Sequence, residues 1–322
     1  MPSEKKKLPL PPLPRPQRCL WQHGTTWYLG AGAKDRMKSE ANRRSAECLV
    51  QLQNPDTGWR RFGCYSTWPE ALRQLRRLSG PQRHLFELIP HGRRCKPYLD
   101  LDGPPLPCHG MSTLEEVIAR GDRAIRTVFS EDYGVELVPE RDVVWLASPQ
   151  ANKLSLHVTV STHAPQLVFR SNHKEDPQGA YHLASRVKEL DPDGVGALVD
   201  LKVYSKDREL RCIGASKYGK PGTAFLRVAR DGHGHGHGHP SHDALVTCLD
   251  PAASLRTIQV PPGVSHAHAR EPRGNTSSLK MPPQVERIEE DQDRISTRML
   301  DLVRDRVHPT AFHNPTHGAE AP

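Results

Sequence analysis

Two acidic residues one position apart are the part of the sequence best suited to chemistry. Residues 98–103 read YLDLDG, so Asp100 and Asp102 alternate with leucines. In a β-strand successive side chains point to opposite faces, which puts both carboxylates on one face. Carboxylates this close repel each other unless a positive charge lies between them, and a hard divalent cation with oxygen ligands is the usual partner. The pattern predicts a metal site on a strand whose leucines face a core. A solvated strand end is the simpler alternative.

A second polar row is expected in residues 152–160, NKLSLHVTV. The same alternation puts Lys153, Ser155 and His157 on one face and the apolar residues on the other. A cation, a hydroxyl and an imidazole in one row can cradle phosphate oxygens, although a strand with a wet polar face is the alternative. A serine nucleophile is not expected. Neighbours on one face of a strand point outward in parallel, and the sequence has no G-x-S-x-G motif.

A third acid opens a cation-rich stretch. Asp200 lies in the apolar setting VDLKV, and the chain continues to residue 220 through what we predict to be a hairpin. Guanidinium and ammonium groups on this hairpin can bind phosphates. The competing interpretation is a charged hairpin on a solvent-exposed surface that binds nothing. The cations concerned are Arg208, Arg211, Lys217 and Lys220.

Apolar periodicity predicts the elements that must position these residues. Helices are expected where apolar residues recur at helical spacing after a capping signal, such as Ser112 or Thr113 followed by Glu115 and Glu116. Strands are expected where apolar and polar residues alternate. The expected helices are 69–78, 113–129 and 179–190, and the expected strands are 84–89, 97–101, 143–147, 154–160, 199–203 and 209–213.

The chain divides into a folded centre and flanks. We expect a disordered Pro/Lys-rich tail over 1–18, a core over 19–256, a linker over 257–282, a charged helix within 283–308 and a disordered tail over 309–322. In the first tail, Lys5–Lys7 has the composition of a nuclear-localisation patch and Leu8–Pro16 that of a ligand for proline-reading domains, but a solvated tail is the simpler interpretation. The alternating glycines and histidines of His233–His239 favour adventitious metal binding over a fixed site.

Composition narrows the class of protein. The 322 residues carry a formal net charge of +8, and residues 1–99 hold 19 Lys and Arg against seven Asp and Glu. This basic front favours an anionic partner such as nucleic acid. Seven scattered cysteines without a CxxC indicate a reducing intracellular compartment, and neither disulfides nor a structural zinc site are expected. No apolar run has the length of a membrane span or a secretory signal, so we expect no membrane association and no export.

In their order along the chain and in the residues around each motif, the three stretches resemble the archaeo-eukaryotic primase superfamily. The likeness is closest to the catalytic cores of eukaryotic primase-polymerases and of herpesvirus and large-DNA-virus primases. It begins at residues 83–90 (RHLFELIP), continues through the acid-x-acid motif of 95–102 (CKPYLDLD) and includes the Ser-x-His motif at Ser155 and His157. Asp200 resembles the third acid, and residues 203–217 resemble the family's hairpin. The likeness covers roughly residues 83–226, somewhat under half of the chain.

The resemblance implies an α+β fold of two α/β modules, with an RRM-like antiparallel sheet carrying the acids. It implies a DNA-directed primase-polymerase that transfers NTP or dNTP to a 3′-hydroxyl on a DNA template by two-metal chemistry with Mg²⁺ or Mn²⁺. The implied catalytic and metal-binding residues are Asp100, Asp102 and Asp200; the implied nucleotide-binding residues are Lys153, Ser155, His157, Arg211 and Lys217; Arg83 and Arg208 are implied neighbours of nucleotide or template. A helicase is an expected partner, and a nucleus or a viral replication site is the expected location.

Two features depart from the family. Asp102 stands where cellular primase-polymerases usually have Glu, which preserves a carboxylate but shortens its arm. The Cys/His zinc module that follows the catalytic core in these relatives has no counterpart, because only Cys248 follows Cys212. Primer extension is therefore the firmer expectation, and de novo priming would call for a separate zinc-bearing subunit.

Parts of the sequence are also compatible with two other classes of protein. A non-catalytic nucleic-acid-binding scaffold derived from a primase core is the main alternative, although the presence of all three acids argues against decay. A rolling-circle nicking protein needs an H-x-H metal pair on a strand. Here that spacing occurs only within His233–His239 and at His266 and His268, both in linker-like sequence.

Overall fold

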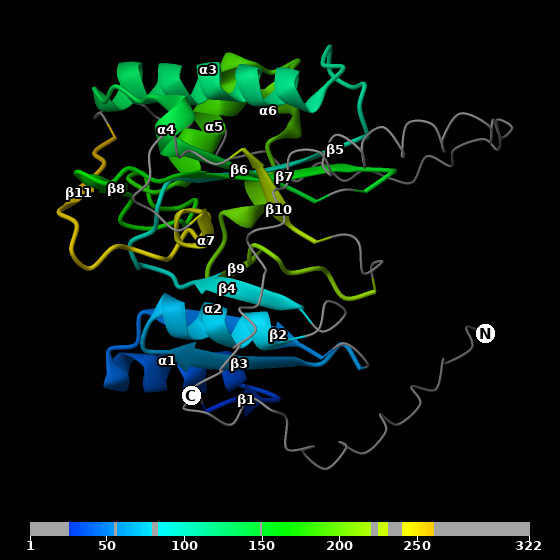
Figure 1. Ribbon diagram of the computed structural model, residues 1–322. Coiled ribbons are helices and arrows are strands. Elements are labelled where there is room, and N and C mark those ends of the chain that lie inside the picture. Colours follow the sequence, from blue (N-terminus) through cyan, green and yellow to red (C-terminus); the bar gives the residue numbers. More distant parts are fainter. Residues whose placement is uncertain are drawn as a thin grey trace, which may run out of the picture.

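The computed structural model describes residues 26–54, 57–78, 83–148, 150–219, 225–230 and 240–260. These residues form a mixed α+β fold around two antiparallel sheets, one below the other in Figure 1. Several predicted features lie outside the described residues: the tail 1–18, Lys220, His233–His239, most of the linker 257–282, the charged helix within 283–308 and the tail 309–322. Within the described part, no helix is both long and apolar enough to span a membrane.

The lower module is a five-stranded sheet with a helix on each face. Its strand order is β1-β3-β2-β4-β9, and every neighbouring pair is antiparallel. On β2, Val50 packs with residues of α2 on one face, and Leu49 packs with residues of α1 on the other. The elements are β1 (Tyr28–Leu29), α1 (Ala33–Arg44), β2 (Cys48–Gln53), β3 (Arg60–Tyr65), α2 (Trp68–Arg77), β4 (Leu85–Ile89) and β9 (Arg208–Arg211).

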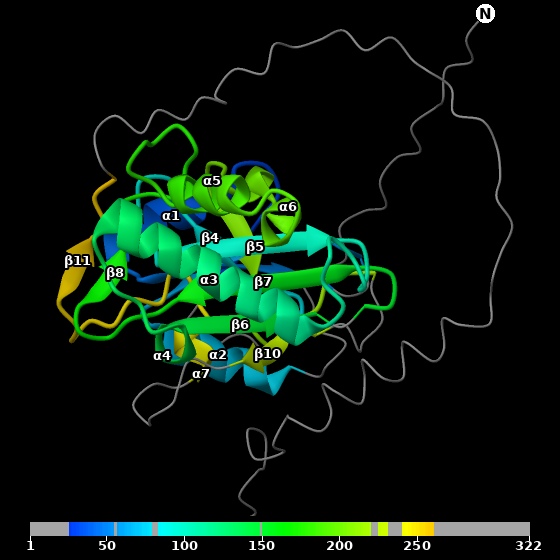
Figure 2. The same cartoon turned by 90° about the horizontal axis from the view of Figure 1, so that it is seen from above.

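The upper module is a four-stranded antiparallel sheet with its helices on one face (Figures 1 and 2). Its strand order is β10-β6-β7-β5, and Leu99, Leu101, Leu156 and Val158 belong to the core beneath the helices. The strands are β5 (Tyr98–Gly103), β6 (Val143–Ala147), β7 (Leu154–Val160) and β10 (Arg227–Arg230), and the covering helices are α3 (Leu114–Tyr133), α5 (Tyr181–Leu190) and α6 (Val195–Leu198). Shorter elements are α4 (Pro139–Asp142), α7 (Pro240–Asp243) and the parallel pair β8 (Gln166–Val168) and β11 (Leu255–Thr257).

Most predicted elements are confirmed. The strands predicted at 143–147 and 154–160 have the predicted bounds, and the three predicted helices are present with ends shifted by a few residues. Thr113 is the N-cap of α3: its side chain accepts the Glu116 N–H, and the Glu116 carboxylate accepts the N–H groups of Ser112 and Thr113. This capping box satisfies N–H groups that would otherwise lack partners at the helix start.

Two predictions around Asp200 are wrong. Residues 199–203 do not form a strand. Val199 alone among them forms a β-bridge, to Leu101, and Leu201–Val203 is a 3₁₀ turn (η2). The Asp200 side chain accepts the Lys202 N–H at 2.9 Å, and this local cap replaces the ladder that the alternating valines and leucine favour. The cation-rich segment is also not a simple hairpin. Its strand β9 pairs with β4 of the lower sheet, and the next strand, β10, lies beyond the predicted segment and pairs with β6 of the upper sheet.

The linker boundary is also too early. Ile258 and Val260 are buried, and the Val260 N–H donates to Gln178 Oε1 at 2.6 Å. Residues 257–260 therefore belong to the packed core.

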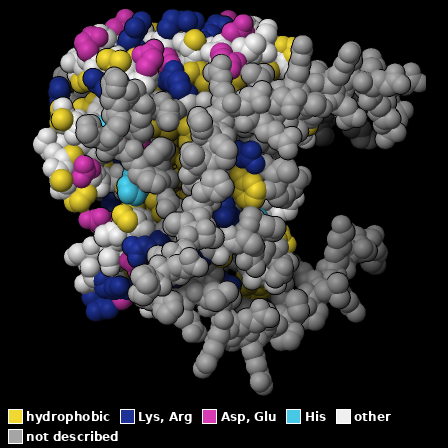
Figure 3. Space-filling view, in the orientation of Figure 1, with side chains coloured by type: hydrophobic (Ala, Val, Ile, Leu, Met, Phe, Trp, Pro, Cys, Tyr) yellow, Lys and Arg dark blue, Asp and Glu magenta, His cyan; other side chains and the backbone are white. Residues whose placement is uncertain are grey.

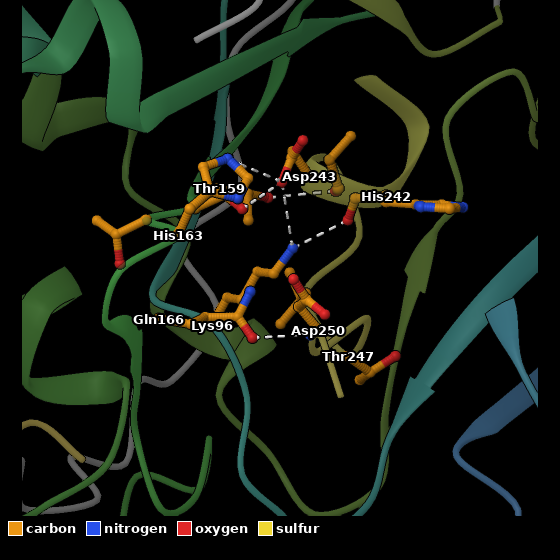
Figure 4. Close-up of polar contacts among 12 residues, drawn as sticks. Lys96, Thr159, His163, Gln166, His242, Asp243, Thr247 and Asp250 are labelled. Carbon is orange, nitrogen blue, oxygen red and sulfur yellow. Dashed lines mark hydrogen bonds and ion pairs between the residues drawn. The ribbon is translucent and has the colours of Figure 1, made fainter. Parts of the chain in front are cut away.

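A buried polar cluster joins the two modules where residues 242–247 run between them (Figure 4). Lys96 is 1% exposed and donates from Nζ to the His242 carbonyl at 2.9 Å, with Asp243 at 4.0 Å. Asp243 accepts from Ser161 Oγ at 2.6 Å, at the end of β7. Glu87 on β4 accepts the N–H groups of Val246 and Thr247. Burial lowers the pKa of Lys96 and raises the pKa of Glu87, so each charge depends on these contacts.

Helix α3 approaches the upper sheet at Gly121. A Cβ at this position would clash with the Trp145 ring, whose Cζ2 would lie 2.8 Å away. Trp145 cannot easily move, because it is fully buried and its Nε1 donates to Asp122 at 2.9 Å. We expect Gly121→Ala to lower the free energy of unfolding by about 1–3 kcal/mol. Urea denaturation would measure the loss, with Arg123→Ala on the exposed side of α3 as the control. An unchanged midpoint would show that the sheet accommodates the methyl group.

Candidate metal centre

The three predicted acids meet on the face of the upper sheet away from its helices. Asp100 and Asp102 project from β5, while Leu99 and Leu101 lie in the core on the other side. Asp200 reaches the same place from the turn after α6, where its N–H donates to the Asp100 carbonyl at 2.9 Å. One carboxylate oxygen from each acid lies within 4.8 Å of the others. The predicted grouping is confirmed, although Asp200 arrives on a turn instead of a strand.

Gly103 allows the third acid to come this close. A side chain at Gly103 would clash with Leu198, the last residue of α6. Without a Cβ on Gly103, α6 packs directly against the end of β5, and the chain leaving α6 passes beside Asp100. The isolated bridge between Leu101 and Val199 fixes the register of this approach.

The acids have the electrostatic character of a cation site. Burial, the neighbouring Asp102 and then Asp200 raise the pKa of Asp100 to about 7, against the influence of Lys217. Oδ1 of Asp102 is buried and has no hydrogen-bond partner among the described residues, while its Oδ2 lies 2.7 Å from Lys153 Nζ. An unsatisfied buried carboxylate oxygen beside two further carboxylates fits a hard divalent cation such as Mg²⁺ or Mn²⁺. These three residues could therefore hold a metal ion.

Strand β7 places the Ser-x-His pair directly opposite the acids. In the antiparallel register, His157 faces Asp100 and Ser155 faces Asp102. His157 Nε2 lies 3.4 Å from Asp100 Oδ1, and burial together with Arg211 and Lys217 lowers the pKa of His157 well below its usual range. A neutral imidazole is thus expected at neutral pH. The Ser155 hydroxyl is buried without a hydrogen-bond partner among the described residues, so it can serve a bound ligand.

Besides Lys153, cations reach the site from β9 of the other module and from the segment after it. Arg211 on β9 is 3% exposed and donates from Nη1 to Ser148 Oγ at 3.0 Å. Burial lowers the pKa of Arg211 to about 10, and burial followed by the Arg211 charge lowers the pKa of Lys217. Arg208, at the other end of β9, carries a buried Nε without a partner in the described part of the chain, and its charge acts on Asp100 and His157. Positive charge therefore faces the three acids across the two sheets.

Arg83, a predicted neighbour of nucleotide or template, contacts the segment that leads to Lys217. Arg83 Nε donates to the Leu78 carbonyl at 2.9 Å, and the Arg83 carbonyl accepts the Ser216 N–H at 2.8 Å. Arg83 is thus next to the segment that carries Lys217. Sequence reasoning missed Ser148, which holds Arg211. The residue follows β6 without any pattern that sets it apart, so no local signal could have indicated it.

Comparison with known proteins gives one distant relative. The chain is 25% identical over 189 residues, 54% of its length, to a protein of Acanthamoeba polyphaga mimivirus described as "Uncharacterized putative helicase R8". The match spans 18% of that viral protein. A search of protein-family models finds none that matches.

Proposed function

We propose that this chain is the core of a metal-dependent nucleotidyltransferase of the primase-polymerase type, which adds nucleotides to a 3′-hydroxyl on a DNA template. One observation carries the proposal, the grouping of acids and cations at one place. Asp100 pairs with His157 and Asp102 pairs with Ser155 across β5 and β7, and Asp200 completes the acidic group. The positive charges of Arg211 and Lys217 act on these acids from the other side. Acids for metal and cations for phosphate are the two halves of a phosphoryl-transfer site.

Each side chain then has a role that follows from its surroundings. Divalent cations held by the acids would activate the 3′-hydroxyl and stabilise charge on the α-phosphate. The unpaired Ser155 hydroxyl donates to a phosphate oxygen, and Arg211 and Lys217 neutralise the triphosphate and the departing pyrophosphate. Neutral His157 positions the phosphates without adding a charge next to Asp100.

Two further observations support the proposal. The order of the motifs resembles the archaeo-eukaryotic primases, and the antiparallel sheet with helices on one face is compatible with the RRM-like module that this resemblance implies. The viral relative is named for a helicase, and the similar segment makes up a minor part of it. We infer a setting in DNA replication, with helicase activity on a partner or on another segment.

The test is nucleotide incorporation by the purified chain. Primed and unprimed DNA templates would be incubated with labelled NTPs or dNTPs and either Mg²⁺ or Mn²⁺. We expect primer extension by the parent chain, its loss in Asp102→Asn and Asp200→Asn, and its retention in Glu131→Gln, which removes an exposed carboxylate from α3. Product on the unprimed template would show priming without a zinc module. If DNA is bound but neither template yields product, the non-catalytic scaffold replaces this proposal.

A further inference from the structure

Two exposed aromatic side chains lie on segments that touch each other next to Lys217, and the proposed chemistry does not use them. Trp59 is 37% exposed and Tyr218 is 40% exposed, and they are the aromatic members of the set of exposed large hydrophobic residues in the described part of the chain. We call this pair the aromatic edge. Large aromatic side chains gain most from burial, so two of them exposed at one place point to a ligand that covers them.

The two residues come together because two segments far apart in sequence touch. Tyr218 lies on the backbone of Gly58, where a Cβ would be 2.9 Å from Tyr218 Cε1. Gly58 has a φ of +69°, which suits glycine, and Trp59 is the next residue, at the start of β3. Tyr218 also meets His84 edge to face, with ring centroids 6.2 Å apart. The turn between β2 and β3 thus lies against the segment that follows β9.

A cation adjoins each residue of the aromatic edge in the sequence. Lys217 precedes Tyr218, and its charge acts on Asp102 and Asp100. Arg60 follows Trp59; its side chain is 58% exposed, and its Nη1 donates to Glu209 Oε2 at 3.3 Å. Aromatic faces for bases next to cations for phosphates are the recognition elements of proteins that bind single-stranded nucleic acid.

We propose that Trp59 and Tyr218 form a stacking platform for the bases of a single-stranded nucleic acid and lead that strand to the metal centre. This inference rests on the proposed function, because it identifies the strand as the template. Stacking tolerates any base, which suits a template of arbitrary sequence. Lys217 precedes Tyr218 and its charge acts on Asp100 and Asp102, so a strand stacked on Tyr218 would bring its phosphates toward the cations of the site.

The experiment measures binding of the full chain to a fluorescein-labelled oligothymidylate by anisotropy, in EDTA so that no chemistry occurs. We expect Tyr218→Ala and Trp59→Ala each to weaken binding by about 5- to 150-fold, which corresponds to the loss of one stacked base. Tyr218→Phe keeps the ring and is expected to bind within about twofold of the parent. Leu190→Ala, which removes an exposed apolar side chain on α5, is the control and should bind like the parent.

An abasic oligonucleotide of the same length separates stacking from charge. The parent chain should lose affinity on this ligand, whereas Tyr218→Ala should bind the two oligonucleotides equally, with the same dependence on salt. Because Tyr218 packs on Gly58, thermal melting of each variant checks that the fold is intact. Trp59→Ala is the second variant should Tyr218→Ala unfold.

Some outcomes would overturn the platform. The first is that both alanine variants bind the oligonucleotide as tightly as the parent. The second is that the parent binds the normal and the abasic strand equally. The third is that the alanine variants bind free nucleoside triphosphate more weakly but bind the strand as the parent does. The last result would assign the aromatic edge to the incoming nucleotide. The platform and the proposed function fail separately. Intact stacking without nucleotide incorporation contradicts only the enzyme, and incorporation without stacking contradicts only the platform.

Discussion

Replacing Asp100 by Asn is expected to abolish activity and to make the metal-free protein more stable. Asn removes a metal-binding charge, and we expect nucleotide incorporation to fall by at least about a hundredfold. The same change removes a carboxylate whose pKa is raised first by burial and then by the charges of Asp102 and Asp200. Relief of this repulsion and desolvation should raise the free energy of unfolding by on the order of 1–3 kcal/mol.

Thermal and urea unfolding in EDTA would measure the gain, and added Mn²⁺ would complete the test. The parent chain should be stabilised by Mn²⁺, because an ion that binds only the folded state shifts the equilibrium, and Asp100→Asn should lose most of this effect. Glu131→Gln, an exposed change on α3, should match the parent in all three measurements. An Asp100→Asn variant that is less stable than the parent in EDTA would contradict the view that these acids repel one another.

Replacing Lys96 by Met is expected to cause the largest loss of stability. Methionine matches the length of the lysine stem but leaves the His242 carbonyl without this donor, and it leaves Asp243 and Glu87 without their buried cation. Breaking a buried ionic cluster by removing one partner typically costs about 3–5 kcal/mol. Because the cluster joins β4 to the end of β7 through residues 242–247, the loss should loosen the contact between the two modules.

Urea unfolding followed by circular dichroism would measure this loss, with Lys174→Met as the exposed control. A double variant, Lys96→Met with Asp243→Asn, should lose less stability than the two single changes added together, because the two residues belong to one network. A loss below about 1 kcal/mol for Lys96→Met would show that the cluster contributes little beyond the packing of the lysine stem.

Local pattern was sufficient for the strands that carry the site. Alternation predicted that Asp100 and Asp102 share a face, as do Ser155 and His157. The register of β5 with β7 and the place of the intervening leucines in the core confirm it. The side-chain period of a strand depends on the backbone alone, so it can be read from any sequence that alternates strongly. The capping box of α3 was predictable for the same reason, since Thr113 and Glu116 are within one turn.

Prediction failed where a local hydrogen bond competed with periodicity. Residues 199–203 alternate like a strand, but the Asp200 carboxylate caps the Lys202 N–H and the backbone turns. Close packing of α6 against Gly103 holds that turn beside β5. The alternating pattern alone carries no information on which of these two arrangements has the lower free energy.

The sequence by itself indicated candidate residues for binding metal and phosphate, and on which face of β5 and β7 they lie. Only the tertiary structure decided that His157 faces Asp100, that Asp200 joins them, and that Arg211 comes from a different sheet. The same holds for the junction at Lys96 and for the contact of Gly58 with Tyr218, which are about 160 residues apart in the sequence. The physical reason is that face and capping depend on neighbours in sequence, whereas register and the docking of modules depend on packing between distant segments.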